Sequence, residues 1–117
     1  GETSHAPLGT LFGARSGDKG GCANLGVWAK DLDAFAFLSS FLTIEKLKEL
    51  MPDLKEFKIE RFDLPNILSL NFYIHDILED GVSSNSRKDA QAKSLGEYLR
   101  AKKANIPSSL LETLNES

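Results

Sequence analysis

The segment ILSLNFYIHDI, residues 67–77, decides the fold because it alternates along its length. Its apolar members fall on one side and its polar or smaller members on the other: Leu68, Leu70, Phe72 and Ile74 against Ser69, Asn71, Tyr73 and His75. Successive side chains of a strand point to opposite faces. The segment therefore predicts a strand in a sheet that is covered on one face only.

Two more alternating segments, residues 7–14 and 24–30, lie near the amino terminus. The run RSGDKGGC, residues 15–22, separates them. Glycine adopts positive φ without steric cost, so a glycine-rich run is typical of a loop. These residues predict a hairpin with a long connection. Residues 56–62 predict the third strand, and the turn Leu64-Pro65-Asn66 leads into the fourth, residues 67–77.

Helical spacing of apolar residues appears in three places. Residues 31–51 predict one bent helix or two short ones, ended by Pro52. A variant capping box begins at Ser86 and predicts a helix over residues 87–103, lined by Leu95, Gly96 and Leu99. A short helix is expected after Pro107.

The predicted element order is β-β-α-β-β-α. Moving the last strand of a ferredoxin-like fold to the front gives this order. We therefore expect an α+β two-layer sandwich in circularly permuted order: a four-stranded antiparallel sheet, strand order 1-2-4-3, with the helices on one face. The expected divisions are a flexible end over residues 1–6, the domain over 7–106 and a helical tail over 107–117.

Composition narrows the class of protein. The 117 residues carry a net charge of −3, and the pI is near 5.4. This argues against nucleic-acid binding, which favours a basic face. No apolar run is long enough to span a bilayer, so no membrane partner is expected. Cys22 is the one cysteine, which favours a reducing, cytoplasmic location. With two histidines, neither a metal nor another cofactor is expected.

The charged, glycine-rich run is the first candidate site. Arg suits bidentate contact with an anion, and Lys adds a point charge. In the permuted fold, this run, the end of the fourth strand and the helix start at Ser86 meet at one end of the sheet. The candidate binding residues are Arg15, Ser16, Gly17, Asp18, Lys19, Gly20, Asn24, Asn71, Ser86, Arg87 and Asp89. The alternative is a solvated hairpin tip. The spacing is not that of a Walker loop.

Catalytic signals are weaker. His75 is a candidate general acid or base; the competing interpretation is a half-exposed histidine on a polar sheet face. Cys22 is either a nucleophile or, more commonly for cysteine, a small buried apolar residue.

The sequence resembles the AtuA-like ferredoxin-fold domain that closes the acyclic terpene utilisation proteins. Three groups of residues carry the resemblance: ARSGDKG (14–20) with ANLGV (23–27); LPN (64–66) with LNF (70–72); and GV (81–82), SR (86–87) and DAQAK (89–93). Two positions depart from the pattern: Gly21 stands where an acidic residue is expected, and Ala92 where a glycine is frequent. The loss of a carboxylate at Gly21 argues against metal or general-base chemistry there.

The resemblance implies a link to the catabolism of branched acids through acyl-CoA thioesters. It implies either a stand-alone relative or the carboxyl-terminal domain of a larger protein. The leading hypothesis is an accessory domain that binds an anion or a partner domain through residues 15–20. The alternative is a small enzyme or half-enzyme acting on an acyl-CoA or carboxylic acid, with His75 as acid or base and Arg15 as anion clamp, completed by a partner domain or a second subunit. A third hypothesis is a homodimer joined through Trp28 and Tyr73 on the open sheet face.

Overall fold

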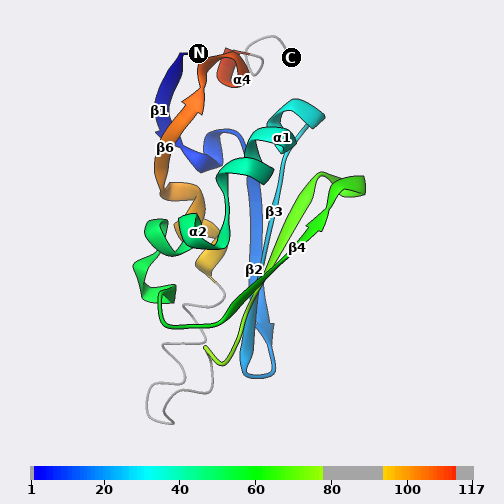
Figure 1. Ribbon diagram of the computed structural model, residues 1–117, viewed down its shortest axis with the longest axis vertical. Coiled ribbons are helices and arrows are strands. Elements are labelled where there is room, and N and C mark those ends of the chain that lie inside the picture. Colours follow the sequence, from blue (N-terminus) through cyan, green and yellow to red (C-terminus); the bar gives the residue numbers. More distant parts are fainter. Residues whose placement is uncertain (1, 78–93, 113–117) are drawn as a thin grey trace.

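A computed structural model describes residues 2–77 and 94–112, and it is mixed α+β (Figure 1). The four-stranded antiparallel sheet has the order β2-β3-β5-β4, and a two-stranded antiparallel sheet joins β1 to β6. The strands are β1 Thr3–Pro7, β2 Gly13–Lys19, β3 Cys22–Trp28, β4 Ile59–Leu64, β5 Ser69–Ile74 and β6 Lys103–Pro107. The helices are α1 Leu32–Phe41, α2 Ile44–Leu50, a helix over residues 94–101 and α4 Ser108–Glu112, with 3-10 turns at Leu8–Thr10, Pro52–Leu54 and Pro65–Ile67.

One face of the four-stranded sheet builds the core. The alternating apolar residues of β3 and β5 are buried: Ala23, Leu25, Val27, Leu70, Phe72 and Ile74. They belong to one cluster with helix residues such as Leu38, Leu47, Leu95 and Leu99. The alternation in residues 67–77 is thereby confirmed from Leu70 to Ile74. Leu68 is the exception, since its φ of 53° puts it in the left-handed region before the strand begins.

The segment 31–51 forms two helices, the second of the two forms expected. Asp31 caps α1, since its Oδ1 accepts a 2.8 Å hydrogen bond from the Ala34 N–H. Thr43 caps α2 in the same way, accepting from Lys46 N at 3.0 Å. A capping residue has extended backbone geometry, so Thr43 ends the first helix as it starts the second.

The expected strand over residues 7–14 is wrong. Leu8, Leu11 and Phe12 are all buried, with the spacing of a helical turn, and a 3-10 turn over Leu8–Thr10 brings them to one side. The expected long loop over residues 15–22 is also wrong. β2 runs to Lys19 and β3 begins at Cys22, so the connection is Gly20-Gly21, with Gly20 at φ +61°. A two-residue hairpin turn favours glycine at positive φ, which accounts for the glycines there.

Two strands were not predicted. β1 pairs with β6 from Thr3↔Pro107 to Pro7↔Lys103, in the region that the sequence argument set aside as a flexible end. β1 is mostly exposed and polar, so it lacks the apolar alternation that reveals a strand. The helix predicted to reach residue 103 ends at 101. β4 begins at Ile59 rather than at residue 56.

The helix over residues 94–101 lies directly on β2. The Gly96 N–H donates a 2.9 Å hydrogen bond to the Ser16 Oγ. A Cβ on Gly96 would lie 3.3 Å from the backbone of Ala14 and Arg15. Glycine at position 96 therefore allows the helix to lie close to the sheet. The hydrogen bond shows that Ser16 lies on the helix side of β2.

Candidate binding face

The second face of the four-stranded sheet is the candidate site, and we call it the open face. Its residues alternate with the buried ones. On the two central strands they are Cys22, Asn24, Gly26, Trp28, Ser69, Asn71 and Tyr73, and His75 follows directly after β5. None of the eight is buried, whereas their neighbours along the two strands are.

Strand register brings residues that are distant in sequence into rows across this face. One row is Arg15↔Gly26↔Asn71↔Phe62, and the next is Gly17↔Asn24↔Tyr73↔Glu60. Directly opposed residues of antiparallel strands share a face. The register thus places Arg15, Gly17, Asn24 and Asn71, four of the candidate binding residues, on the open face together.

Two glycines, Gly17 and Gly26, lie between these polar groups on the open face. A Cβ on Gly17 would meet no atom within 4 Å, and one on Gly26 would come no nearer than 3.7 Å, to the Asn71 Oδ1. Among the described residues, Gly17 and Gly26 therefore place no side chain of their own between Arg15 and the amides of Asn24 and Asn71. A ligand can approach the sheet backbone here more closely than it could over larger residues.

One end of the open face is apolar. The row Gly13↔Trp28↔Ser69↔Leu64 runs across it, and the Trp28 indole covers Gly13, where a Cβ would collide with the ring. Trp28, Phe62 and Leu64 are 41%, 49% and 42% exposed. We call these three residues the apolar patch. Neighbouring large exposed apolar groups are typical of a surface that binds something.

The opposite end carries four groups able to react or exchange protons. The Tyr73 and His75 rings meet edge to face, with centroids 4.9 Å apart, and the His75 Nε2 lies 3.6 Å from the Glu60 Oε1. A hydrogen bond between the Tyr73 hydroxyl and Cys22 raises the pKa of Tyr73 above its usual value, and the charges of Cys22 and Glu60 act in the same direction. We call these four residues the thiol cluster.

The model of one protein family, the AtuA ferredoxin-like domain, matches residues 6–105. The chain belongs to this family. The match extends from the end of β1 into β6, so the open face lies within the AtuA ferredoxin-like domain. Searches of curated proteins and of solved structures return no match.

The AtuA domain does not gather all the predicted site residues. Ser16 lies on the helix side of β2, bonded to Gly96. Asp18 pairs with the buried Ala23, which places it on the helix side as well. Lys19 occupies the last position of β2, paired with Cys22. The run from Arg15 to Gly20 is thus divided between two faces, because most of it is a strand and not a loop.

Three predicted residues, Ser86, Arg87 and Asp89, lie outside the described residues. The convergence of a helix start with the hairpin therefore stays a prediction. Over residues 2–77 and 94–112, no three His, Cys, Asp or Glu side chains are arranged to hold a metal ion. The same part of the chain contains no helix of the length and apolarity needed to cross a membrane.

Glu60, Phe62 and Leu64 were missed as open-face residues. The signal was present in β4, where they alternate with Arg61 and Asp63, but the predicted strand ended at residue 62. Without the last two residues of β4, the register across the sheet was incomplete.

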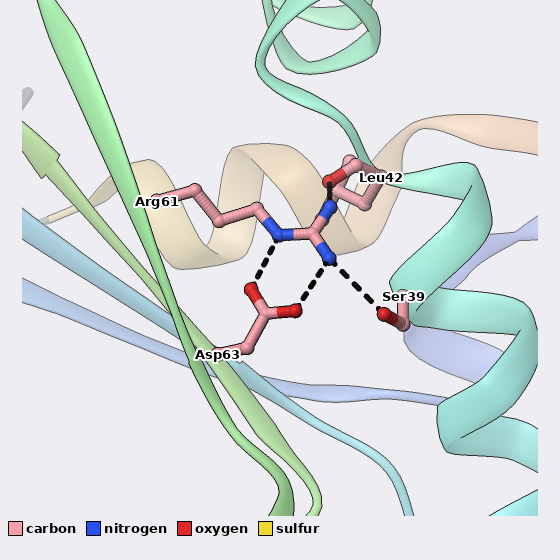
Figure 2. Close-up of polar contacts among 4 residues, drawn as sticks. All are labelled: Ser39, Leu42, Arg61 and Asp63. Carbon is pink, nitrogen blue, oxygen red and sulfur yellow. Dashed lines mark hydrogen bonds and ion pairs between the residues drawn. The ribbon is translucent and has the colours of Figure 1, made fainter.

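Arg61, on the helix side of β4, has a structural role (Figure 2). Its Nε and Nη2 donate to the two oxygens of Asp63 at 2.7 and 3.0 Å. Its Nη1 donates to the Leu42 carbonyl at 3.0 Å, and Nη2 also donates to the Ser39 Oγ at 3.1 Å. One guanidinium thus ties the edge strand of the sheet to the end of α1.

Proposed function

We propose that this AtuA ferredoxin-like domain is an accessory binding domain whose open face binds an anion with an apolar chain. The observation that carries the proposal is the row Arg15↔Gly26↔Asn71↔Phe62, which runs from a cation to an exposed aromatic ring across a glycine. The ligand class is a medium-chain carboxylic acid or its thioester.

Arg15 is suited to the anionic end. Arg15 is exposed, and it pairs with Gly26, so the paired residue on β3 has no side chain that could block the guanidinium. A guanidinium offers a planar fork of donors to a carboxylate, and a charge-assisted hydrogen bond contributes about 1.5–3 kcal/mol. The side-chain amide of Asn71 lies in the same row as Arg15 and that of Asn24 lies in the next row, and both offer further donors.

The apolar patch is suited to the chain of the ligand. Phe62 is three strand positions from Arg15 across the sheet, a span of about 14 Å at about 4.8 Å per strand. Trp28 is two residues along β3 from Gly26, about 7 Å away. An acid of medium length reaches the patch from Arg15, whereas acetate does not.

The link to branched acids and acyl-CoA catabolism belongs to this proposal, and its support is the family itself. We likewise infer a cytoplasmic location, and a place beside a larger family domain or as a stand-alone relative. We infer that the fold is a ferredoxin-like sandwich in circularly permuted order with helices on one face. The strand order β2-β3-β5-β4 supports that description.

Calorimetric titration with octanoate, with acetate as the control ligand, tests the proposal. We expect octanoate to bind and Arg15→Ala to weaken binding about tenfold or more, since each 1.4 kcal/mol is a factor of ten. Lys55→Ala, which removes an exposed cation outside the four-stranded sheet, is the matched control and should bind normally. The proposal is wrong if the Arg15→Ala and parent proteins bind octanoate equally, or if the parent protein does not bind it.

The double change of Arg15 and Lys19 to Ala extends the test. Arg15 is an exposed residue of β2 and Lys19 is the last residue of that strand, so we expect lost binding with little change in stability. If the double variant unfolds, these residues are structural, which contradicts the proposed role.

A further inference from the structure

We propose that Cys22 is a nucleophilic thiol with His75 as its base, and that it accepts an acyl group from a thioester on the open face. The proposal does not depend on anion binding by Arg15, because it concerns other residues at the opposite end of the face from the apolar patch.

Tyr73 adjoins both the thiol and the imidazole. Ala23 pairs with Ile74, the last residue of β5, so Cys22 and His75 flank the last pair of the β3–β5 register. The Tyr73 and His75 ring centroids are 4.9 Å apart, and the Tyr73 hydroxyl interacts with Cys22. Cys22 is a free, half-buried cysteine, partly accessible to a reagent. A hydrogen bond with this cysteine raises the pKa of the Tyr73 hydroxyl, which places the two groups side by side.

Glu60 orients the imidazole. The His75 Nε2 is buried and has no hydrogen-bond partner among the described residues, and the Glu60 Oε1 lies 3.6 Å away. The imidazole tautomer with its proton on Nε2 directs that proton toward the carboxylate. Nδ1 then keeps its lone pair and is the nitrogen free to accept a proton. Glu60 is a positioning residue, and His75 is the base.

The transfer of the acyl group needs one nucleophile and one base. Nδ1 takes the Cys22 proton as Sγ bonds to the carbonyl carbon of the thioester. The carbon–sulfur bond of the donor then breaks, and its thiolate leaves with the proton from His75. The acyl group ends on Cys22 and a free thiol is released. A thioester fits this set because its leaving group is itself a thiolate, which departs without the strong acid that an amide or alkyl ester requires.

The chain has one cysteine, so any thiol adduct reports on Cys22. Incubation with the neutral acetyl thioester of N-acetylcysteamine, followed by intact-mass measurement, should give one acetyl adduct that hydroxylamine removes. We expect Cys22→Ser to give none and His75→Gln to slow its formation on the order of a hundredfold. His5→Gln and Tyr98→Phe change the other histidine and the other tyrosine and should react like the parent protein.

A second measurement covers the case in which His75→Gln does not fold. Iodoacetamide should alkylate Cys22 faster in the native parent protein at pH 7 than in the same protein unfolded in urea. Glu60→Asp should retain more of the acetylation rate than Glu60→Gln, because only the former keeps a carboxylate toward Nε2. No adduct, a folded His75→Gln variant as fast as the parent, or native alkylation no faster than unfolded would each overturn the proposal.

Discussion

Arg61 shows how much a single side chain holds together. Its guanidinium contacts Asp63, the Leu42 carbonyl and Ser39, and its side chain is only 16% exposed. We expect Arg61→Ala to lower the free energy of unfolding by about 1–3 kcal/mol, since the Leu42 carbonyl loses its donor. Arg61→Lys should recover only part of this, because an ammonium lacks the planar fork. Urea denaturation measures both. A lysine variant as stable as the parent would contradict this account.

The carboxylate of Asp63, the partner of Arg61, makes the stability of the fold depend on pH. The hydrogen bond from Arg61 lowers the pKa of Asp63 below its ordinary value of 3.8. A lowered folded-state pKa contributes stability above the unfolded-state value, and that contribution is lost as the pH falls through the folded-state value. We therefore expect the stability difference between the parent and Asp63→Asn to be present at pH 7 and to shrink below about pH 4.

The size of this pH effect should be small. Asp63 is 47% exposed, so solvent screens the pair, and less than about 1 kcal/mol is expected. Paired urea denaturations at pH 7 and pH 3 decide the point. A difference that grows on acidification has the wrong sign for a lowered pKa.

At the scale of elements, apolar periodicity was enough to predict a strand or helix from the sequence where the element packs on one side. It identified β3, β5, α1 and α2 because each of them buries alternate or helically spaced residues. It failed for β1, whose residues are mostly exposed and which is held by main-chain pairing with β6. It also misjudged residues 15–19, where glycines that suggested a loop stand in a strand.

The site was predictable to the same extent. Arg15, Asn24 and Asn71 were found because their residue types suit anions, but strand register, not loop geometry, brings them together. Ser16 was misplaced since a one-residue step along a strand changes its face. The place of Glu60 on the open face depends on the register of β4. That register could not be predicted because the predicted strand ended at residue 62.

The contact between β2 and the helix over residues 94–101 gives an element-scale prediction. Gly96→Ala gains about 1 kcal/mol of helix propensity. The new Cβ would lie 3.3 Å from β2 backbone that is paired to β3 and cannot withdraw, and overpacking costs about 1–3 kcal/mol. We expect a net loss of stability by urea denaturation. Gly17→Ala, with nothing within 4 Å of its Cβ, is the control and should change stability by less than about 0.5 kcal/mol. A stabilised Gly96→Ala variant would disprove the tight contact.

At the scale of the whole molecule, the open face of the four-stranded sheet is less buried among the described residues than the face that builds the core. We propose that the apolar patch drives association of two copies when no ligand is present. We expect sedimentation velocity to show a concentration-dependent homodimer that Trp28→Ser weakens. Leu32→Ser, which changes an exposed apolar residue of α1, should leave the association unchanged. Monomer alone at high concentration would argue against self-association.

Nuclear magnetic resonance with octanoate tests the central claim, that the open face is the binding surface, most directly. Three side-chain signals report from that face: the amide groups of Asn24 and Asn71 and the indole N–H of Trp28, the one tryptophan. The amide of Asn105, on β6 in the second sheet, is the internal control. The account predicts that the three open-face signals move together to saturation while Asn105 stays in place. Movement of Asn105 without the other three, or no movement of any signal, would contradict it.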